Sequence, residues 1–159
     1  SDTAKITGEK KIAQPAFDPS YCGAGSRRWL GYHTGTSEAH LAYSDNGWST
    51  KMEVDGDATT QGIQPLDDTA KFVSVDCRNK AVVASWGDWP TKADASAHLD
   101  ETRELGVIAS CDGGSSFQKL EPAPNEGSQG PAGVAVSGDG GKLGVAWKAP
   151  NLLRFAVSK

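Results

Sequence analysis

Ser110-Cys111-Asp112-Gly113-Gly114-Ser115-Ser116-Phe117 is the stretch of this sequence that decides its fold. The Asp112 carboxylate can accept hydrogen bonds from backbone N–H groups two or more residues further on. Gly113 and Gly114 supply the positive φ angles of a tight turn, and Phe117 offers an apolar side chain to pack beneath it. The pattern predicts a rigid turn between two strands, and the alternative is an ordinary Asp-Gly hairpin, the commonest short turn signal between strands.

A weaker second copy of this turn is expected in the sequence Tyr43-Ser44-Asp45-Asn46-Gly47-Trp48-Ser49. This copy keeps an Asp and a Gly, at Asp45 and Gly47, but it loses the first Ser and displaces the aromatic residue. On its own the second copy would be a weak signal, and it gains weight from the repeat in which both turns lie.

The composition indicates a single all-β domain. The chain has 159 residues, 19 of them Gly, and short alternating runs such as 81–86 and 105–109 stand between Gly, Pro, Asp and Asn clusters. A net charge of −4 argues against nucleic acid as a partner, since a basic surface is required for it. No apolar stretch approaches the roughly 20 residues that cross a bilayer, and a mature exported product fits a chain with no signal segment before Ser1.

A four-stranded unit recurs along the chain, with approximate blades at 12–57, 68–122 and 131–159. The equivalent ends of the second strand are taken as His33, Trp86 and Trp147, and those of the third strand as Ser44, Cys111 and Ser158. These choices give separations of 11, 25 and 11 residues, so the middle unit carries a long inserted loop. Four strands recurring at about 40 to 60 residues are typical of β-propeller blades.

With both turns inside such a repeat, the chain resembles the Asp-box (BNR) repeat propellers, a family that includes sialidases, some xyloglucan-active glycosidases and many non-enzymatic exported receptors. The resemblance implies that each Asp-box joins the third and fourth strands of a blade, away from the central pocket. It therefore implies a structural role for six residues, which are Asp45, Gly47, Ser110, Asp112, Gly114 and Phe117.

Three blades cannot close a ring, because propellers need about four blades or more. We therefore expect a partial propeller that is completed most simply by a second copy, which would make six blades, with a companion chain or a longer parent polypeptide as the alternatives. Residues 1–11 are a candidate closing strand, which could be lent to a neighbouring chain.

The same resemblance implies that the loops between second and third strands face the pocket. The candidate binding residues on these loops are His33, Trp86, Asp88, Trp89, His98, Asp100, Trp147 and Lys148. Simpler explanations exist: the tryptophans at 86 and 147 look like core, and the long loop is equally explained as a solvated surface excursion or as a contact to another subunit. No catalytic residue, cofactor or metal site is assigned, since the three histidines are too scattered for a metal motif.

Two function classes follow. The preferred hypothesis is a non-enzymatic, secreted or periplasmic module that binds a glycan or protein or serves assembly. The alternative is a fragment of a sialidase-like or other glycan-active hydrolase whose catalytic residues lie mostly outside this chain. The Arg-Ile-Pro signature of sialidases is absent, and the available carboxylates lie in one loop.

The three cysteines allow one disulfide. The repeat places Cys77 and Cys111 at the ends of the first and third strands of one blade, which predicts a Cys77–Cys111 bridge if the turn after Cys77 curls over the second strand. Cys22 is then free or bonded to a partner chain. Three buried thiols in a cytosolic protein are the alternative.

Overall fold

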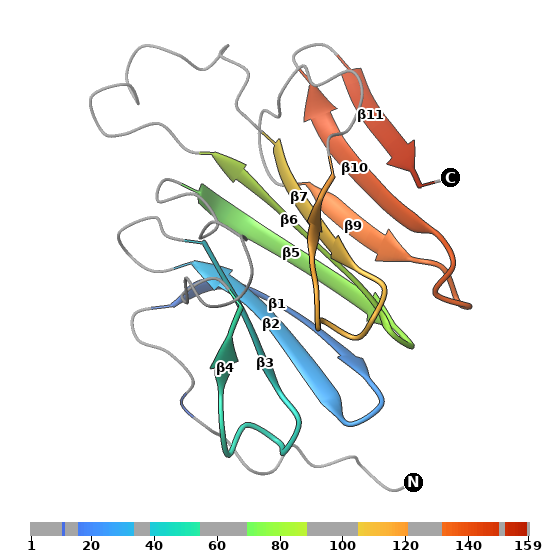
Figure 1. The fold of residues 1–159 in the computed structure, drawn as a ribbon. Coiled ribbons are helices and arrows are strands. Elements are labelled where there is room, and N and C mark those ends of the chain that lie inside the picture. Colours follow the sequence, from blue (N-terminus) through green and yellow to red (C-terminus); the bar gives the residue numbers. More distant parts are fainter. Residues whose placement is uncertain are drawn as a thin grey trace, which may run out of the picture.

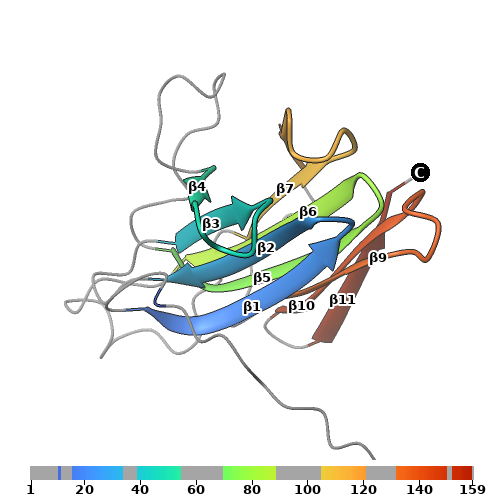
Figure 2. The same ribbon diagram turned by 90° about the horizontal axis from the view of Figure 1, so that it is seen from below.

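The computed structural model describes residues 11, 16–33, 39–54, 70–88, 105–120, 132–149 and 152–158, and within these ranges every regular element is a strand. The strands form three antiparallel sheets that lie side by side in chain order, as Figures 1 and 2 show. We call these sheets blades one, two and three. Their strands are β1 (Phe17–Ala24), β2 (Arg27–His33), β3 (Ala39–Ser44) and β4 (Met52–Glu53); β5 (Ala70–Arg78), β6 (Ala81–Asp88), β7 (Leu105–Ser110) and β8 (Gln118–Lys119); and β9 (Gly133–Val136), β10 (Leu143–Ala149) and β11 (Leu152–Val157).

The blades confirm the predicted all-β partial propeller. Each sheet follows the chain order from its first strand outward, β1-β2-β3-β4, β5-β6-β7-β8 and β9-β10-β11. The predicted closing strand at residues 1–11 lies outside the described residues apart from Lys11. No helix in the described part of the chain is long and apolar enough to span a membrane.

Strand pairing corrects the predicted repeat by one residue at two places. Arg28 pairs with Ser44 and Val82 pairs with Ser110. The Ser158 N–H donates to the Leu143 carbonyl, and the Leu143 N–H donates to the Ser158 hydroxyl. Counting four residues along each second strand from Arg28, Val82 and Leu143 makes Tyr32, not His33, the equivalent of the two tryptophans at 86 and 147. Ser110, not Cys111, is the third-strand end in blade two, because β7 stops there and Cys111 begins the turn.

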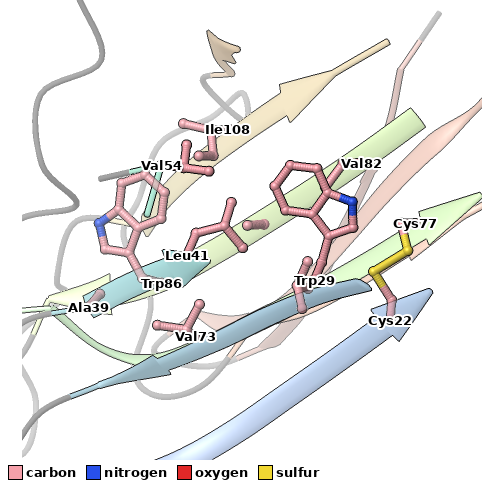
Figure 3. Packing of buried hydrophobic residues seen from close by; sticks show 12 residues of the cluster. Cys22, Trp29, Ala39, Leu41, Val54, Val73, Cys77, Val82, Trp86 and Ile108 are labelled. Carbon is pink, nitrogen blue, oxygen red and sulfur yellow. A yellow bond between two sulfur atoms is a disulfide. The ribbon is translucent and has the colours of Figure 1, made fainter. Parts of the chain in front are cut away.

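The first hydrophobic core fills the space between blades one and two (Figure 3). Trp29 and Leu41 of blade one are almost fully buried against Val73, Val82 and other residues of blade two. At Gly31 the approach is so close that an added Cβ would lie 2.5 Å from a methyl of Val73. Blade one therefore accommodates the first strand of blade two by presenting a residue with no side chain.

A second core fills the space between blades two and three. Val83 and Val107 of blade two are fully buried, and Val136, Val145 and Trp147 of blade three complete the cluster. Burying one such side chain stabilises the fold by about 1.5–3 kcal/mol. Each blade thus becomes stable through its neighbours, since one sheet alone would leave both faces in water.

A covalent bond links the first strands of blades one and two. Cys22 of β1 is bonded to Cys77 of β5, with their Cα atoms 5.7 Å apart (Figure 3). The predicted Cys77–Cys111 bridge is therefore wrong. The Cys77 side chain points into the core between blades one and two, where it meets Cys22, whereas Cys111 is an exposed free thiol in the turn after β7.

A hydrogen bond occupies the equivalent place between blades two and three. Cys22 pairs across its sheet with Trp29, and Asp76 pairs with Val83, which makes Cys22 and Asp76 equivalent in the repeat. The Asp76 carboxylate accepts a hydrogen bond from the backbone N–H of Val136 at 2.8 Å. One position of the repeat therefore links each blade to the next, by a disulfide in one case and by a carboxylate in the other.

The turn at 110–117 joins the third and fourth strands of blade two, as the resemblance implied. Ser110 Oγ accepts a hydrogen bond from the N–H of Gly114 at 2.8 Å, and Asp112 Oδ1 accepts from the N–H of Ser116 at 3.0 Å. Hydrogen bonds from Ser116 and Ser110 hold the pKa of the Asp112 carboxyl well below its usual value. Because the folded-state pKa is the lower one, this stabilisation is present above the unfolded pKa of about 4 and is lost as the pH falls.

The turn at 44–50 has the same hydrogen bonds with different residues from those predicted. Ser44 Oγ accepts from the N–H of Trp48 at 2.9 Å, and Asn46 Oδ1 accepts from the N–H of Thr50 at 2.9 Å. Ser44 therefore holds the first-Ser position, and Asn46 holds the place given to Asp45. An amide oxygen keeps the acceptor without the charge, while Gly47 keeps its positive φ of 64°.

Asp45 instead forms an ion pair that joins the two turns. Both Asp45 oxygens accept hydrogen bonds from the Arg27 guanidinium at 2.7 Å, which raises the pKa of Arg27 and lowers that of Asp45. Arg27 Nη1 also donates to the Gly113 carbonyl of blade two at 2.6 Å. The ring of Trp29 lies against Gly114 and meets the edge of Phe117, with ring centroids 5.8 Å apart. The turn of blade two is thereby held by blade one.

We expect non-reducing peptide mapping to recover a Cys22–Cys77 bridge and a freely alkylated Cys111. Replacing Cys22 and Cys77 together by Ser should lower the free energy of unfolding by about 2–4 kcal/mol, because the bridge closes a long loop in the unfolded chain. The control variant Cys111→Ser should unfold like the parent protein. A bridge that contains Cys111 would contradict this assignment.

Two neighbouring glycines offer a matched test of the contact between blades one and two. Gly113 and Gly114 have φ angles of 80° and 87°, but an added Cβ at Gly113 meets nothing within 4 Å, whereas at Gly114 it would lie 2.3 Å from the Trp29 ring. Gly113→Ala should cost about 1 kcal/mol of stability from backbone strain alone. Gly114→Ala should cost a further 1–3 kcal/mol or so from overpacking, and equal costs in urea unfolding would disprove the contact.

Candidate functional site

One end of the three blades gathers the predicted pocket-side residues. The second strands β2, β6 and β10 all run toward this end (Figure 1). They finish at His33, Asp88 and Ala149, so that the loops expected to share a face do leave from the same end. We call it the pocket end, and we call the opposite end, with the β1–β2 and β5–β6 turns, the turn end.

The structure separates the eight candidate binding residues into three groups. Trp86 and Trp147 belong to the two cores and are 9% and 2% exposed, which confirms the simpler explanation for both. Trp89, His98 and Asp100 lie outside the described residues, and Asp88 is described only through its backbone at the end of β6. His33 and Lys148 are the two with described side chains at the pocket end, the first buried and the second exposed.

His33 forms a pair that the sequence analysis did not identify. Its Nε2 lies 2.9 Å from Oδ2 of Asp18, the second residue of β1. The His33 side chain is 10% exposed, whereas the Asp18 side chain is 56% exposed. Phe17 stacks on the imidazole with ring centroids 5.3 Å apart and an interplanar angle of 22°. The exposed Asp18 carboxylate is therefore held in one orientation by its contact with the buried His33 imidazole.

The backbone at Asp18 is unusual in two respects. Its φ is +48°, a left-handed conformation that is uncommon outside Gly, although Asp and Asn adopt it more readily than other residues. The next residue is Pro19, which normally keeps the preceding residue extended. The strain accompanies a shift of pairing register in β1 between Phe17 and Ser20. Strained backbone persists where the surrounding structure enforces it, and such positions cluster at functional sites.

The register shift is a feature of the repeat, but the carboxylate is not. Strand β5 shifts register between Lys71 and Ser74, at the matching place in blade two. The residue there that corresponds to Asp18 is Phe72. An irregular first-strand start is therefore common to both blades, and blade one alone uses it to present an acid. The Asp18-Pro19 pair was the available sequence signal.

Asp18 can act as a hydrogen-bond acceptor for a sugar hydroxyl or as a general base toward water. Hydrolysis of a glycosidic bond normally requires a second carboxyl, about 5–5.5 Å away for retention of configuration or about 6.5–9.5 Å away for inversion. The described residues offer no such partner with a placed side chain. They also contain no group of three or more His, Cys, Asp or Glu side chains that could hold a metal ion.

The turn end contains a cleft of about 530 Å³ between blades one and two. Its charged lining includes Arg27, Asp45 and Asp112. Arg27 and Asp45 pair with each other, and Asp112 is bonded within its own turn. Arg27 and Asp45 thus belong to the contact between the blades and Asp112 belongs to its own turn, which leaves Lys80 as the other charged residue of the lining.

Comparison with known proteins supports the fold. No protein-family model matches the chain, and no curated protein matches it. Among solved structures it is similar to the protein described as "Bacteroides ovatus Xyloglucan PUL GH43B", with a TM-score of 0.50 and 9% identity over 89% of this chain and 27% of that one. The chain thus spans about a quarter of that protein. At this identity the likeness concerns the propeller fold alone.

Two further structures have lower scores. One is an alpha-L-arabinofuranosidase from Lactobacillus brevis, with a TM-score of 0.46 and 15% identity over 92% of this chain and 51% of that one. The other is a GH43_1 enzyme from Xanthomonas citri, with a TM-score of 0.43 and 12% identity over 82% of this chain and 39% of that one.

Two substitutions test whether the backbone at Asp18 is strained, because Asp18→Gly and Asp18→Ala both remove the carboxylate. In ordinary strand Gly is less stable than Ala by about 0.5–1 kcal/mol. At a left-handed position the order should reverse. Denaturant unfolding should then give the Gly variant a free energy of unfolding about 1 kcal/mol higher than that of the Ala variant. A more stable Ala variant would show that Asp18 has no such strain.

Proposed function

We propose that this chain is the part of a glycan-active glycoside hydrolase that supplies one pocket-end carboxylate, with the other catalytic residues outside the described residues. The observation that carries the proposal is the exposed, strained Asp18 held by buried His33 at the pocket end of a propeller. The fold similarity to a protein whose description includes xyloglucan and GH43 supports a polysaccharide as the substrate class.

In the proposed reaction Asp18 lies on the first strand, beside the first strand of the next blade. It accepts a proton from a water as that water attacks the anomeric carbon of the substrate, and it must be ionised to do so. The buried His33 fixes the carboxylate orientation through their 2.9 Å contact, which limits the side-chain freedom that would otherwise be lost on reaching the transition state. A second carboxyl across the pocket is the general acid, and it protonates the leaving oxygen as the glycosidic C–O bond breaks.

This proposal prefers the hydrolase fragment to the non-enzymatic binding or assembly module that the sequence favoured. A binding module needs no strained acid at the head of its first strand, and none of its expected ligand contacts at Trp86 or Trp147 is accessible. Membership of the Asp-box family and a sialidase-like activity remain predictions. The Cys22–Cys77 disulfide supports an exported, secreted or periplasmic protein, because such bonds persist in oxidising compartments.

The test compares Asp18→Asn with Asp139→Asn in the native particle acting on xyloglucan and a panel of other plant polysaccharides. Asn tolerates the left-handed backbone and removes the charge and one acceptor oxygen at nearly the same side-chain size. We expect Asp18→Asn to lower kcat by about 10²- to 10⁴-fold, the usual contribution of a general base, at an unchanged melting temperature.

Asp139 is the matched control because it is exposed and lies in the β9–β10 turn at the opposite end, where Ser137 and the N–H of Gly141 donate to it. Its replacement should leave kcat at the parent value. The proposal fails if the parent particle cleaves none of the polysaccharides, or if Asp18→Asn retains full kcat.

A further inference from the structure

The outward side of β11 exposes large apolar side chains. Leu153, Phe155 and Val157 are 78%, 69% and 51% exposed, and they alternate along the strand with the half-buried Arg154 and Ala156, which face blade two. Soluble proteins seldom leave such a row of neighbouring apolar side chains in water unless another surface covers it. We call these three residues the outward face of blade three.

The repeat shows what covers this position elsewhere in the molecule. Val157 pairs with Gly144 and Phe155 with Ala146, as Ala109 pairs with Val83 and Val107 with Ser85. The outward face of blade three thus corresponds to the residues Leu105, Val107 and Ala109 of blade two, which are 2%, 0% and 5% exposed. In blade two these residues are covered by the next blade. The equivalent residues of blade three are therefore suited to pack against a further blade.

Blade one leaves uncovered the kind of surface with which blade three covers blade two. The residues with which blade three covers blade two include Ala132, Val134 and Val145. The strand registers make their equivalents in blade one Pro19, Tyr21 and Leu30. Tyr21 is 58% exposed, whereas its equivalent in blade two, Val75, is 5% exposed. One chain therefore presents both halves of an interface between blades.

We propose that the outward face of blade three binds the Tyr21 side of blade one of a second copy of this chain. Such head-to-tail contacts between different surfaces form rings when the rotation closes. Two copies bring six blades together, which lies within the usual range of about four to eight. The contact is independent of the catalytic proposal, because it involves packing between blades and not the Asp18 carboxylate.

The linking position of the repeat is compatible with this contact. Cys22 and Asp76 have their equivalent in blade three at Ala135, and Cys77 and Val136 have theirs in blade one at Gly23. Both residues are small and exposed, so nothing obstructs their approach. An added Cβ at Gly23 would lie 3.2 Å from the flexible side chain of Arg28, to which its three nearest atoms belong.

A disulfide between copies tests this geometry directly. The variant Ala135→Cys with Gly23→Cys, in a Cys111→Ser background, copies the native Cys22–Cys77 arrangement across the proposed interface. On oxidation we expect peptide mapping to find a bridge between residues 135 and 23 of different chains, in a species of twice the 16.6 kDa chain mass. Each single cysteine variant is a control and should give no bridge between these two positions.

A second measurement does not depend on oxidation. Sedimentation of the chain should show a species of two copies, and Phe155→Glu should reduce the association constant at least 100-fold. The matched control Gln118→Glu adds the same charge on the exposed outer strand β8 and should leave association unchanged. A folded monomer overturns the proposal. So does the finding that Phe155 is covered by a further blade of the same polypeptide, or by a blade of a different protein.

Discussion

Packing of one blade face against the next is the constraint on which the rest of this structure depends. The sheets are short, their fourth strands have two residues each in blades one and two, and the large buried side chains lie between blades. The links at the first strands, Cys22 to Cys77 and Asp76 to Val136, fix neighbouring blades at the same position of the repeat. The fold is thus stable only as a series of blades.

This rigidity is also what allows blade one to hold an unfavourable backbone. The contacts of β1 offset the conformational free energy of a left-handed residue before proline. Beyond the register shift β1 pairs with β2, and Cys22 bonds it to β5. Phe17 and His33 then fix the carboxylate of Asp18 at the strand head. An acid on a loop would have no comparable restraint, so the strand head is the stronger place for a catalytic group.

Much of the fold could be predicted because its signals are local. Residue types at fixed spacing predict the turn at 110–117. The segments 82–86 and 105–110 have the apolar pattern that predicts strands. The disulfide could not be predicted in the same way, because the choice between Cys22 and Cys111 depends on which sheet face Cys77 occupies. The second turn was misassigned by one residue, since Asn46 supplies the same acceptor as an Asp.

The candidate site was harder to predict for the same physical reason. Asp18 and His33 are 15 residues apart, and only the pairing of β1 with β2 brings them together. The most direct test of the account is the structure of the native particle by electron microscopy. We predict a closed ring of more than three blades, with Phe155 covered by a neighbouring blade and Asp18 facing the pocket. A particle of three blades with Phe155 in solvent would contradict it.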